Sequence, residues 1–178
     1  MIRDDILEAA ALAESPEDKA AVIRECLEAA ALRTLHDSGA FQSICAIGDT
    51  AARFGLGEMQ RVQNLEFALF RKVGYSPEKW LFKIQRYFRF MGLKPRTAFA
   101  RKGQIHSGWI KVTGLLAEAG LSVSDQDVIS FGITIDARAP NGVQITDTAD
   151  SVAIDSENCP AALVKVADEF FVIRYRSN

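Results

Sequence analysis

Two neighbouring segments carry side chains suited to phosphate and metal chemistry. In residues 46–54 (AIGDTAARF), an apolar strand ends in a turn of small residues, and Thr50 stands where a helix is predicted to begin. Backbone N–H groups at such a helix start can hold a phosphate. In residues 61–67 (RVQNLEF), Asn64 and Glu66 are two positions apart on a predicted strand. Side chains at i and i+2 share one face, so this pair could hold a metal ion.

Hydrophobic periodicity and turn residues predict the elements that position these side chains. Ser15 before Pro16 is typical of a helix start, and Gly39 is typical of its end. Residues 128–137 (VISFGITIDA) are rich in β-branched side chains and form the most strand-like stretch, with Asp136 near its end. The expected helices are 3–13, 16–37, 50–54, 77–91 and 115–119, and the expected strands are 44–47, 63–69, 94–101, 105–112, 128–137 and 164–176.

Composition places the chain among ordinary globular proteins. Its 178 residues fit one domain with a hydrophobic core. A run of about 18 apolar residues, which a membrane span needs, is not found, and the first residues lack a signal-peptide pattern, so we expect a cytoplasmic protein without a membrane partner. Cys26, Cys45 and Cys159 are widely spaced, which favours buried thiols over disulfides or a zinc site. Neither His36 nor His106 has a neighbour at metal-ligand spacing.

Charge is unevenly distributed along the chain. Residues 71–102 contain ten Lys or Arg against one Glu, and residues 122–158 contain seven Asp or Glu against one Arg. The basic segment is interleaved with aromatic residues and could contact a polyanion. A second interpretation assigns Trp80, Ile84, Tyr87 and Met91 to the core of the helix at 77–91. Lys79, Lys83 and Arg86 would then form a solvated face of this helix.

Several stretches together resemble the AbiEii/AbiGii nucleotidyltransferase toxins of abortive-infection and type IV toxin–antitoxin systems. Residues 48–53 (GDTAAR) stand where that family has Gly-Gly-Thr-Ala-Leu-Arg, and residues 60–67 (QRVQNLEF) stand where it has Arg-x-Ser-x-Asp-Leu-Asp-Phe. Residues 129–140 (ISFGITIDARAP) follow the family's strand and its Pro-containing turn. Residues 30–39 and 109–121 are also similar, so the resemblance covers about residues 20 to 140 in the family's order.

This resemblance implies an α+β fold, namely a minimal nucleotidyltransferase core in which a mixed β-sheet is flanked by helices. We expect a single domain over residues 1–178, with N-terminal helices in 1–40, the core in 41–140 and C-terminal strands in 141–178. The implied catalytic and metal-binding residues are Asn64, Glu66 and Asp136, and the implied nucleotide-binding residues are Gly48, Asp49, Thr50, Arg53 and Arg61.

The chain departs from the family where the chemistry would occur. Asp49 replaces a glycine and brings negative charge to a turn that should approach phosphates, and Asn64 replaces an Asp and removes a metal-binding charge. Glu66 replaces an Asp with a longer side chain. Gly132 and Thr134 stand where the family has Lys and Glu. These changes predict a catalytically degenerate protein, a pseudoenzyme, because several of them act against nucleotide and metal binding at once.

Three functions follow as alternatives from the resemblance. The first is a binding or regulatory protein in a phage-defence or mobile-element setting, with no cofactor. The second is an active toxin that uses Mg²⁺ and a nucleoside triphosphate to modify an RNA such as tRNA. The third is a non-catalytic partner of a related enzyme or of a cognate antitoxin. An RNA or a protein partner is therefore expected.

Overall fold

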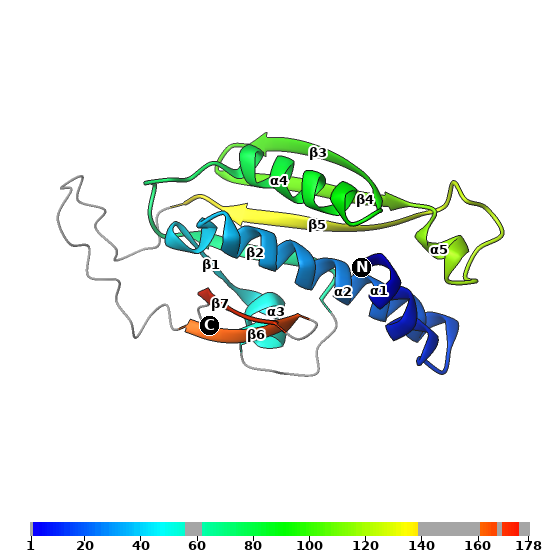
Figure 1. The fold of residues 1–178 in the computed structure, drawn as a ribbon. Coiled ribbons are helices and arrows are strands. Elements are labelled where there is room, and N and C mark those ends of the chain that lie inside the picture. The colour runs from blue at the N-terminus through cyan, green and yellow to red at the C-terminus, as the bar shows by residue number, and fades with distance from the viewer. Residues whose placement is uncertain (1, 56–61, 139–160, 167–168, 175–178) are drawn as a thin grey trace.

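The computed structural model describes residues 2–55, 62–138, 161–166 and 169–174 (Figure 1). The helical elements are α1 (Ile2–Ala11), α2 (Pro16–Asp37), the 3₁₀ turn η1 (Ala40–Gln42), α3 (Gly48–Thr50), the π-helical turn η2 (Ala51–Gly55), α4 (Pro77–Phe90) and α5 (Leu115–Glu118). The strands are β1 (Ile44–Ala46), β2 (Asn64–Leu69), β3 (Lys94–Lys102), β4 (Ile105–Thr113), β5 (Val128–Asp136), β6 (Ala161–Val166) and β7 (Glu169–Arg174).

Five strands form one mixed sheet in the order β1-β2-β5-β4-β3. The pair β2–β5 is parallel, and the other neighbouring strands are antiparallel. Strands β3 and β4 form the predicted hairpin. The sheet and the helices packed on it confirm the expected α+β class.

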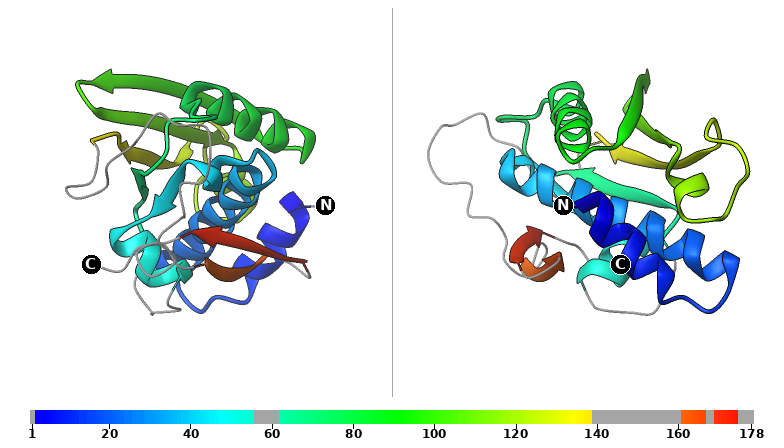
Figure 2. Two further views of the ribbon diagram at one scale, coloured as in Figure 1. Left: turned by 90° about the vertical axis from the view of Figure 1, so that its left-hand side faces the viewer. Right: turned by 45° about the vertical axis from the view of Figure 1, so that its right-hand side comes forward.

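Helices α2 and α4 lie on the same side of this sheet (Figures 1 and 2). The N-cap predicted at Ser15 is confirmed, because its hydroxyl accepts a hydrogen bond from the Asp18 N–H at 3.1 Å. In α4, Trp80, Ile84 and Phe88 are buried against the sheet. Met91 ends the helix and is only partly buried, so the expectation that it belongs to the core was wrong; Phe88 takes that place.

Side chains alternate between the two faces of the sheet: one face is apolar, and the other is largely polar apart from a small buried cluster of Cys45 and Ala68 at its β1–β2 end. On β5, Ile129, Phe131, Ile133 and Ile135 are buried toward the helices. We call the other side the open face. It carries Asn64 and Glu66 of β2, Gly132, Thr134 and Asp136 of β5, Ser107, Trp109 and Lys111 of β4, and Lys94, Arg96 and Ala98 of β3.

The C-terminal segment contains two strands, β6 and β7. Strands β6 and β7 pair antiparallel in a separate two-stranded sheet. This hairpin lies against α2 and η2, below the main sheet in Figure 1. The alternating run predicted over residues 164–176 therefore overlaps the end of β6 and all of β7, because an alternating pattern does not show where a chain reverses.

In the described residues, no helix combines the length and apolar character that crossing a membrane demands. Cys45 is buried and Cys26 is partly buried, and both are free thiols. Burial, followed by the nearby charge of Glu25, raises the pKa of the Cys26 thiol to about 11. Cys159 lies outside the described residues.

Candidate functional site

The residues that the sequence singles out meet on the open face, where β2 and β5 lie side by side. The parallel register places Asn64 opposite Gly132, Glu66 opposite Thr134 and Ala68 opposite Asp136. Glu66 and Asp136 are therefore diagonal neighbours. A strand rises about 3.3 Å per residue, so Asn64 and Asp136 are about 13 Å apart along the strand direction. That separation is too long for both to ligate one cation, whose oxygen ligands lie within about 2.6 Å.

Asn64 is held by the backbone of β5. Its Oδ1 accepts a hydrogen bond from the Gly132 N–H at 2.9 Å. The amide oxygen also fills the space beside Gly132, since a β-carbon at that glycine would lie 2.6 Å from Asn64 Oδ1. The side chain and the glycine are therefore fitted to one another, and the oxygen that could coordinate a metal ion serves as a backbone acceptor.

Thr50 supports the same strand from the other side. Its side chain is completely buried. The hydroxyl accepts the Glu66 N–H at 2.8 Å and donates to the Asn64 carbonyl oxygen at 3.4 Å. Both bonds lie along the edge of β2 that faces β1, at residues that do not pair with β1. In this arrangement the hydroxyl joins α3 to β2 and is not directed at a ligand.

The turn predicted to cradle phosphates places a carboxylate beside its first residue. Gly48 has a positive φ of 54°, and a β-carbon there would collide with Glu66 Oε2. Asp49 is exposed at the next position. A triphosphate approaching this turn would meet two carboxylates, which repel it.

Asp136 is paired with a neighbour that the sequence analysis did not consider. Its Oδ1 accepts the Arg138 backbone N–H at 2.9 Å, and its two oxygens accept the Arg138 guanidinium at 2.5 to 3.0 Å. This bond raises the pKa of Arg138 above its ordinary value. The i, i+2 spacing of the two residues was the available signal. Because Arg138 neutralises Asp136, Glu66 alone among the three predicted metal ligands carries a negative charge with no ion-pair partner in the part of the chain that the structure describes.

The predicted nucleotide-binding arginines lie elsewhere. Arg53 forms an ion pair with Glu25 of α2, on the helix side of the sheet. It lines a groove of about 460 Å³ along α2 together with Arg24, Glu28 and Phe54. Arg61 lies outside the described residues. Among the residues that are described, no three His, Cys, Asp or Glu side chains are grouped so that they could hold a metal ion.

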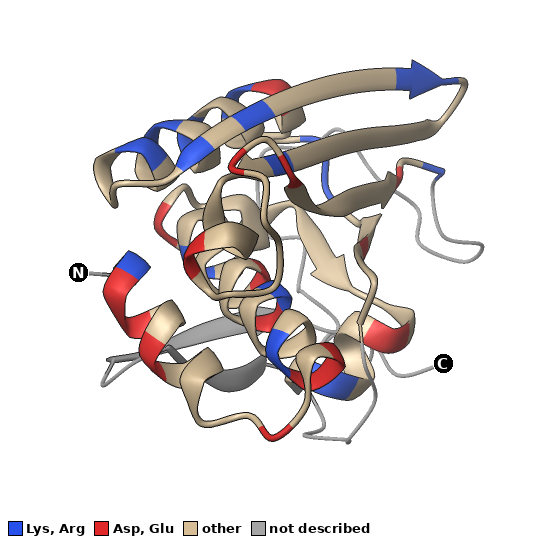
Figure 3. Cartoon of the chain, turned by 90° about the vertical axis from the view of Figure 1, so that its right-hand side faces the viewer, with Lys and Arg blue, Asp and Glu red and all other residues tan. Residues whose placement is uncertain are grey.

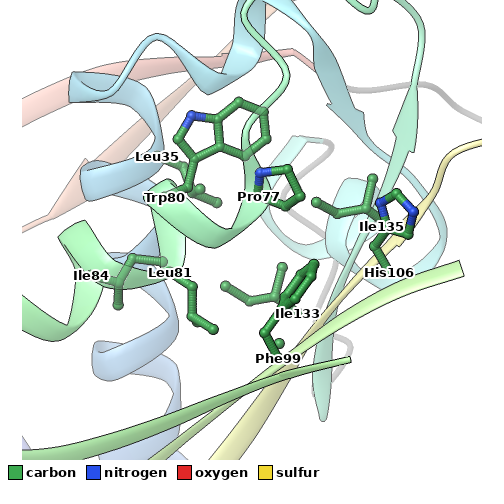
Figure 4. Close-up of a pocket in the computed structure, with 10 residues that line it drawn as sticks. Leu35, Pro77, Trp80, Leu81, Ile84, Phe99, His106, Ile133 and Ile135 are labelled. Carbon is green, nitrogen blue, oxygen red and sulfur yellow. The ribbon is translucent and has the colours of Figure 1, made fainter. Parts of the chain in front are cut away.

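A second polar cluster sits at the opposite side of the sheet, and no sequence signal pointed to it. Tyr75 and His106 stack at a centroid distance of 5.7 Å, and their Oη and Nδ1 atoms are 2.6 Å apart. Burial, followed by the nearby Arg101, lowers the pKa of His106. The adjoining cavity between α4 and the sheet is apolar and measures about 10 Å³ (Figure 4). It is too small for any ligand larger than a water molecule.

No protein-family model, curated protein or solved structure matches this chain.

Proposed function

We propose that this chain is a nucleotidyltransferase-like domain that acts by binding a partner and does not transfer nucleotides. The observation that carries the proposal is the Asn64–Gly132 contact. Asn64 stands where the resemblance implies an acidic metal ligand, and Gly132 stands where it implies a phosphate-neutralising lysine. The Asn64 amide oxygen is instead hydrogen-bonded to the Gly132 N–H, and it leaves no room for a β-carbon at position 132.

The neighbouring groups support the same conclusion. The hydroxyl of Thr50 is used by the backbone of β2, and the carboxylate of Asp136 is neutralised by Arg138. A nucleotidyl-transfer site needs several uncompensated carboxylates to hold a dication beside a triphosphate. Glu66 by itself does not provide them.

Calorimetric titration tests this proposal. ATP, GTP, CTP and UTP are added separately to the wild-type protein with Mg²⁺ or Mn²⁺, and we expect no metal-dependent binding. Micromolar binding that requires the metal and disappears in Asp136→Ala would overturn the proposal and favour an active enzyme.

A variant in which the residues implied by the resemblance are restored provides a second test. Asp49→Gly, Asn64→Asp and Gly132→Lys are combined, because each restores one of the groups that the resemblance implies for nucleotide and metal binding. We expect the restored variant, if circular dichroism shows it folded, to bind a nucleotide with metal more tightly than the wild type. Measurable nucleotide transfer by the wild type, at a rate equal to that of the restored variant, would contradict the proposal.

A further inference from the structure

An exposed tryptophan lies in the middle of the open face. Trp109 is 47% exposed, whereas Trp80, the other tryptophan, is 4% exposed. Its cross-strand neighbours are Ala98 on β3 and Gly132 on β5. The ring extends toward Gly132, where a β-carbon would lie 3.2 Å from Trp109 Cζ3. Small neighbours on both strands leave the indole accessible, although burial of so large an apolar ring would be favourable.

Two positive charges face one another beside this ring. Arg96 and Lys111 are directly opposite in the β3–β4 register, and both are exposed. Like charges at such positions destabilise a sheet. In the described part of the chain, no ion pair compensates either of them. Lys94 adds a third positive charge on the same face, so the charge at this end of the sheet favours binding of an anion.

The acidic groups of the sheet lie at a distance or are already bonded. Asp136 and Glu66 lie toward the other end of the open face, since Asp136 pairs with Ile105 and Lys111 pairs with Ser130. Asp125 and Asp127 are exposed in the loop before β5, and Asp127 accepts a hydrogen bond from the neutral Ser122 hydroxyl. Within the described residues, neither carboxylate forms an ion pair with Arg96 or Lys111.

We infer that the open face binds single-stranded nucleic acid, with Trp109 stacking on a base and Arg96 and Lys111 contacting phosphates. An aromatic ring on a sheet with basic side chains around it suits bases that are unpaired and can be turned outward. A duplex would present its phosphates but hide its bases from the ring. This inference depends on the proposed function only in that the face is used for binding.

A second basic surface supplies a matched control. Lys79 and Lys83 are exposed on α4, which packs on the other side of the sheet through Trp80 and Ile84. Figure 3 shows Lys and Arg positions along both β3 and α4. Removing two charges from α4 changes the net charge as much as removing Arg96 and Lys111 does, but it leaves the open face intact.

The experiment measures the anisotropy of labelled 12-nucleotide RNA and DNA strands of mixed sequence, and the quenching of tryptophan fluorescence. In Trp109→Leu, which keeps an apolar side chain but removes the ring, we expect affinity to fall about 5- to 150-fold, the range that stacking on one ring supplies. Trp109→Phe, which keeps an aromatic ring, should retain part of the affinity that Trp109→Leu loses. The two strands distinguish RNA from DNA as the ligand.

The charge variants test the phosphate contacts. Arg96→Ser with Lys111→Ser should weaken binding and reduce the dependence of log affinity on log salt by about 1.4, or about 0.7 for each phosphate contact in a single strand. Lys79→Ser with Lys83→Ser should change affinity less than about twofold at physiological salt, because screening acts over about 8 Å.

Several outcomes would overturn the inference. Failure of the wild type to bind oligonucleotides would do so, and so would equal losses of affinity in the two charge variants. A folded Trp109→Leu variant with unchanged affinity would also overturn it, as would binding of polyglutamate, a polyanion without bases, as tightly as the oligonucleotides. If the Trp109→Leu variant does not fold, the inference is tested by two other measurements. These are the quenching of tryptophan fluorescence when the oligonucleotide binds the wild type, and the affinities of the two charge variants. Metal-dependent nucleotide binding would contradict the proposed function alone, and failed oligonucleotide binding would contradict this inference alone.

Discussion

The Gly132 N–H donates to Asn64 Oδ1 at 2.9 Å, and so links β5 to β2 through a side chain at the centre of the open face. The two residues are 68 positions apart in the chain. They also share one volume, since the amide occupies the space that any other residue at position 132 would need for its β-carbon. This contact makes the stability effects of the two residues interdependent.

The first prediction concerns this interdependence. Gly132→Ala should destabilise the fold by about 1–2 kcal/mol, because the new β-carbon displaces the Asn64 amide. In an Asn64→Ala background the same substitution should cost less, because only the close approach to Trp109 Cζ3 at 3.2 Å remains. Urea unfolding of the wild type, both single variants and the double variant gives a coupling energy, which we expect to be at least about 0.5 kcal/mol. Strictly additive effects would contradict the shared volume.

The sequence predicted those parts of the fold that depend on local signals. Ser15 and Pro16 mark the start of α2, and alternation in residues 128–137 places Ile133 on the buried face and Asp136 on the other. The same alternation around Ile110 puts Trp109 and Lys111 together on one face, a signal that the sequence analysis left unused.

The contacts of the candidate site could not be predicted in this way. Thr50 bonds to β2 across 14 to 16 positions, and Asn64 bonds to Gly132 across 68. Such contacts depend on strand order and register, which a single sequence does not specify. The role expected for Thr50, at a helix start near phosphates, was argued from local pattern alone, and local pattern does not reveal a backbone partner on another strand.

The second prediction concerns Thr50. Thr50→Val keeps the shape of the side chain but leaves the Glu66 N–H without its acceptor. We expect a loss of about 1–3 kcal/mol in the free energy of unfolding, the usual result of leaving a buried polar group unpaired. Thr50→Ser, which keeps the hydroxyl, is the control and should lose less. A valine variant at least as stable as the serine variant would show that the hydroxyl does not support β2.

The third prediction concerns His106. Burial and the nearby Arg101 lower its pKa below the ordinary 6.5, so the ring should titrate below that value in an NMR experiment on the imidazole C–H signals. Since the unfolded chain takes up this proton at higher pH than the folded protein, stability should decrease as pH falls from about 6.5 through the folded pKa.

Tyr75→Phe tests the geometry of that pair. The Tyr75 hydroxyl lies 2.6 Å from Nδ1 and can donate to it only when the imidazole is neutral. Removing the hydroxyl should therefore make His106 easier to protonate and raise its pKa toward 6.5. A pKa that stays unchanged or falls in this variant would argue against a donated bond from Tyr75.

The fourth prediction concerns Glu28 of α2. Its side chain is 1% exposed, and within the described residues its Oε1 has no hydrogen-bond partner. Burial raises the pKa of Glu28 from 4.5 to about 8, with Glu25 adding to the rise and Arg24 opposing it. Between about pH 4.5 and pH 8 the folded protein holds a proton that the unfolded chain has released. The contribution of Glu28 to stability is therefore complete below pH 4.5 and is lost as pH rises toward 8.

Glu28→Gln removes this titration and keeps the size of the side chain. The variant and the wild type should be similarly stable at pH 4.5, and the variant should be more stable at pH 8, by at least about 1.4 kcal/mol if the shift is one pKa unit or more. Urea unfolding of both proteins at the two pH values measures the difference, and the titrations of other groups largely cancel in it. A difference that does not change with pH would mean that the Glu28 carboxylate reaches water or a hydrogen-bond donor that stabilises its charge in the folded protein.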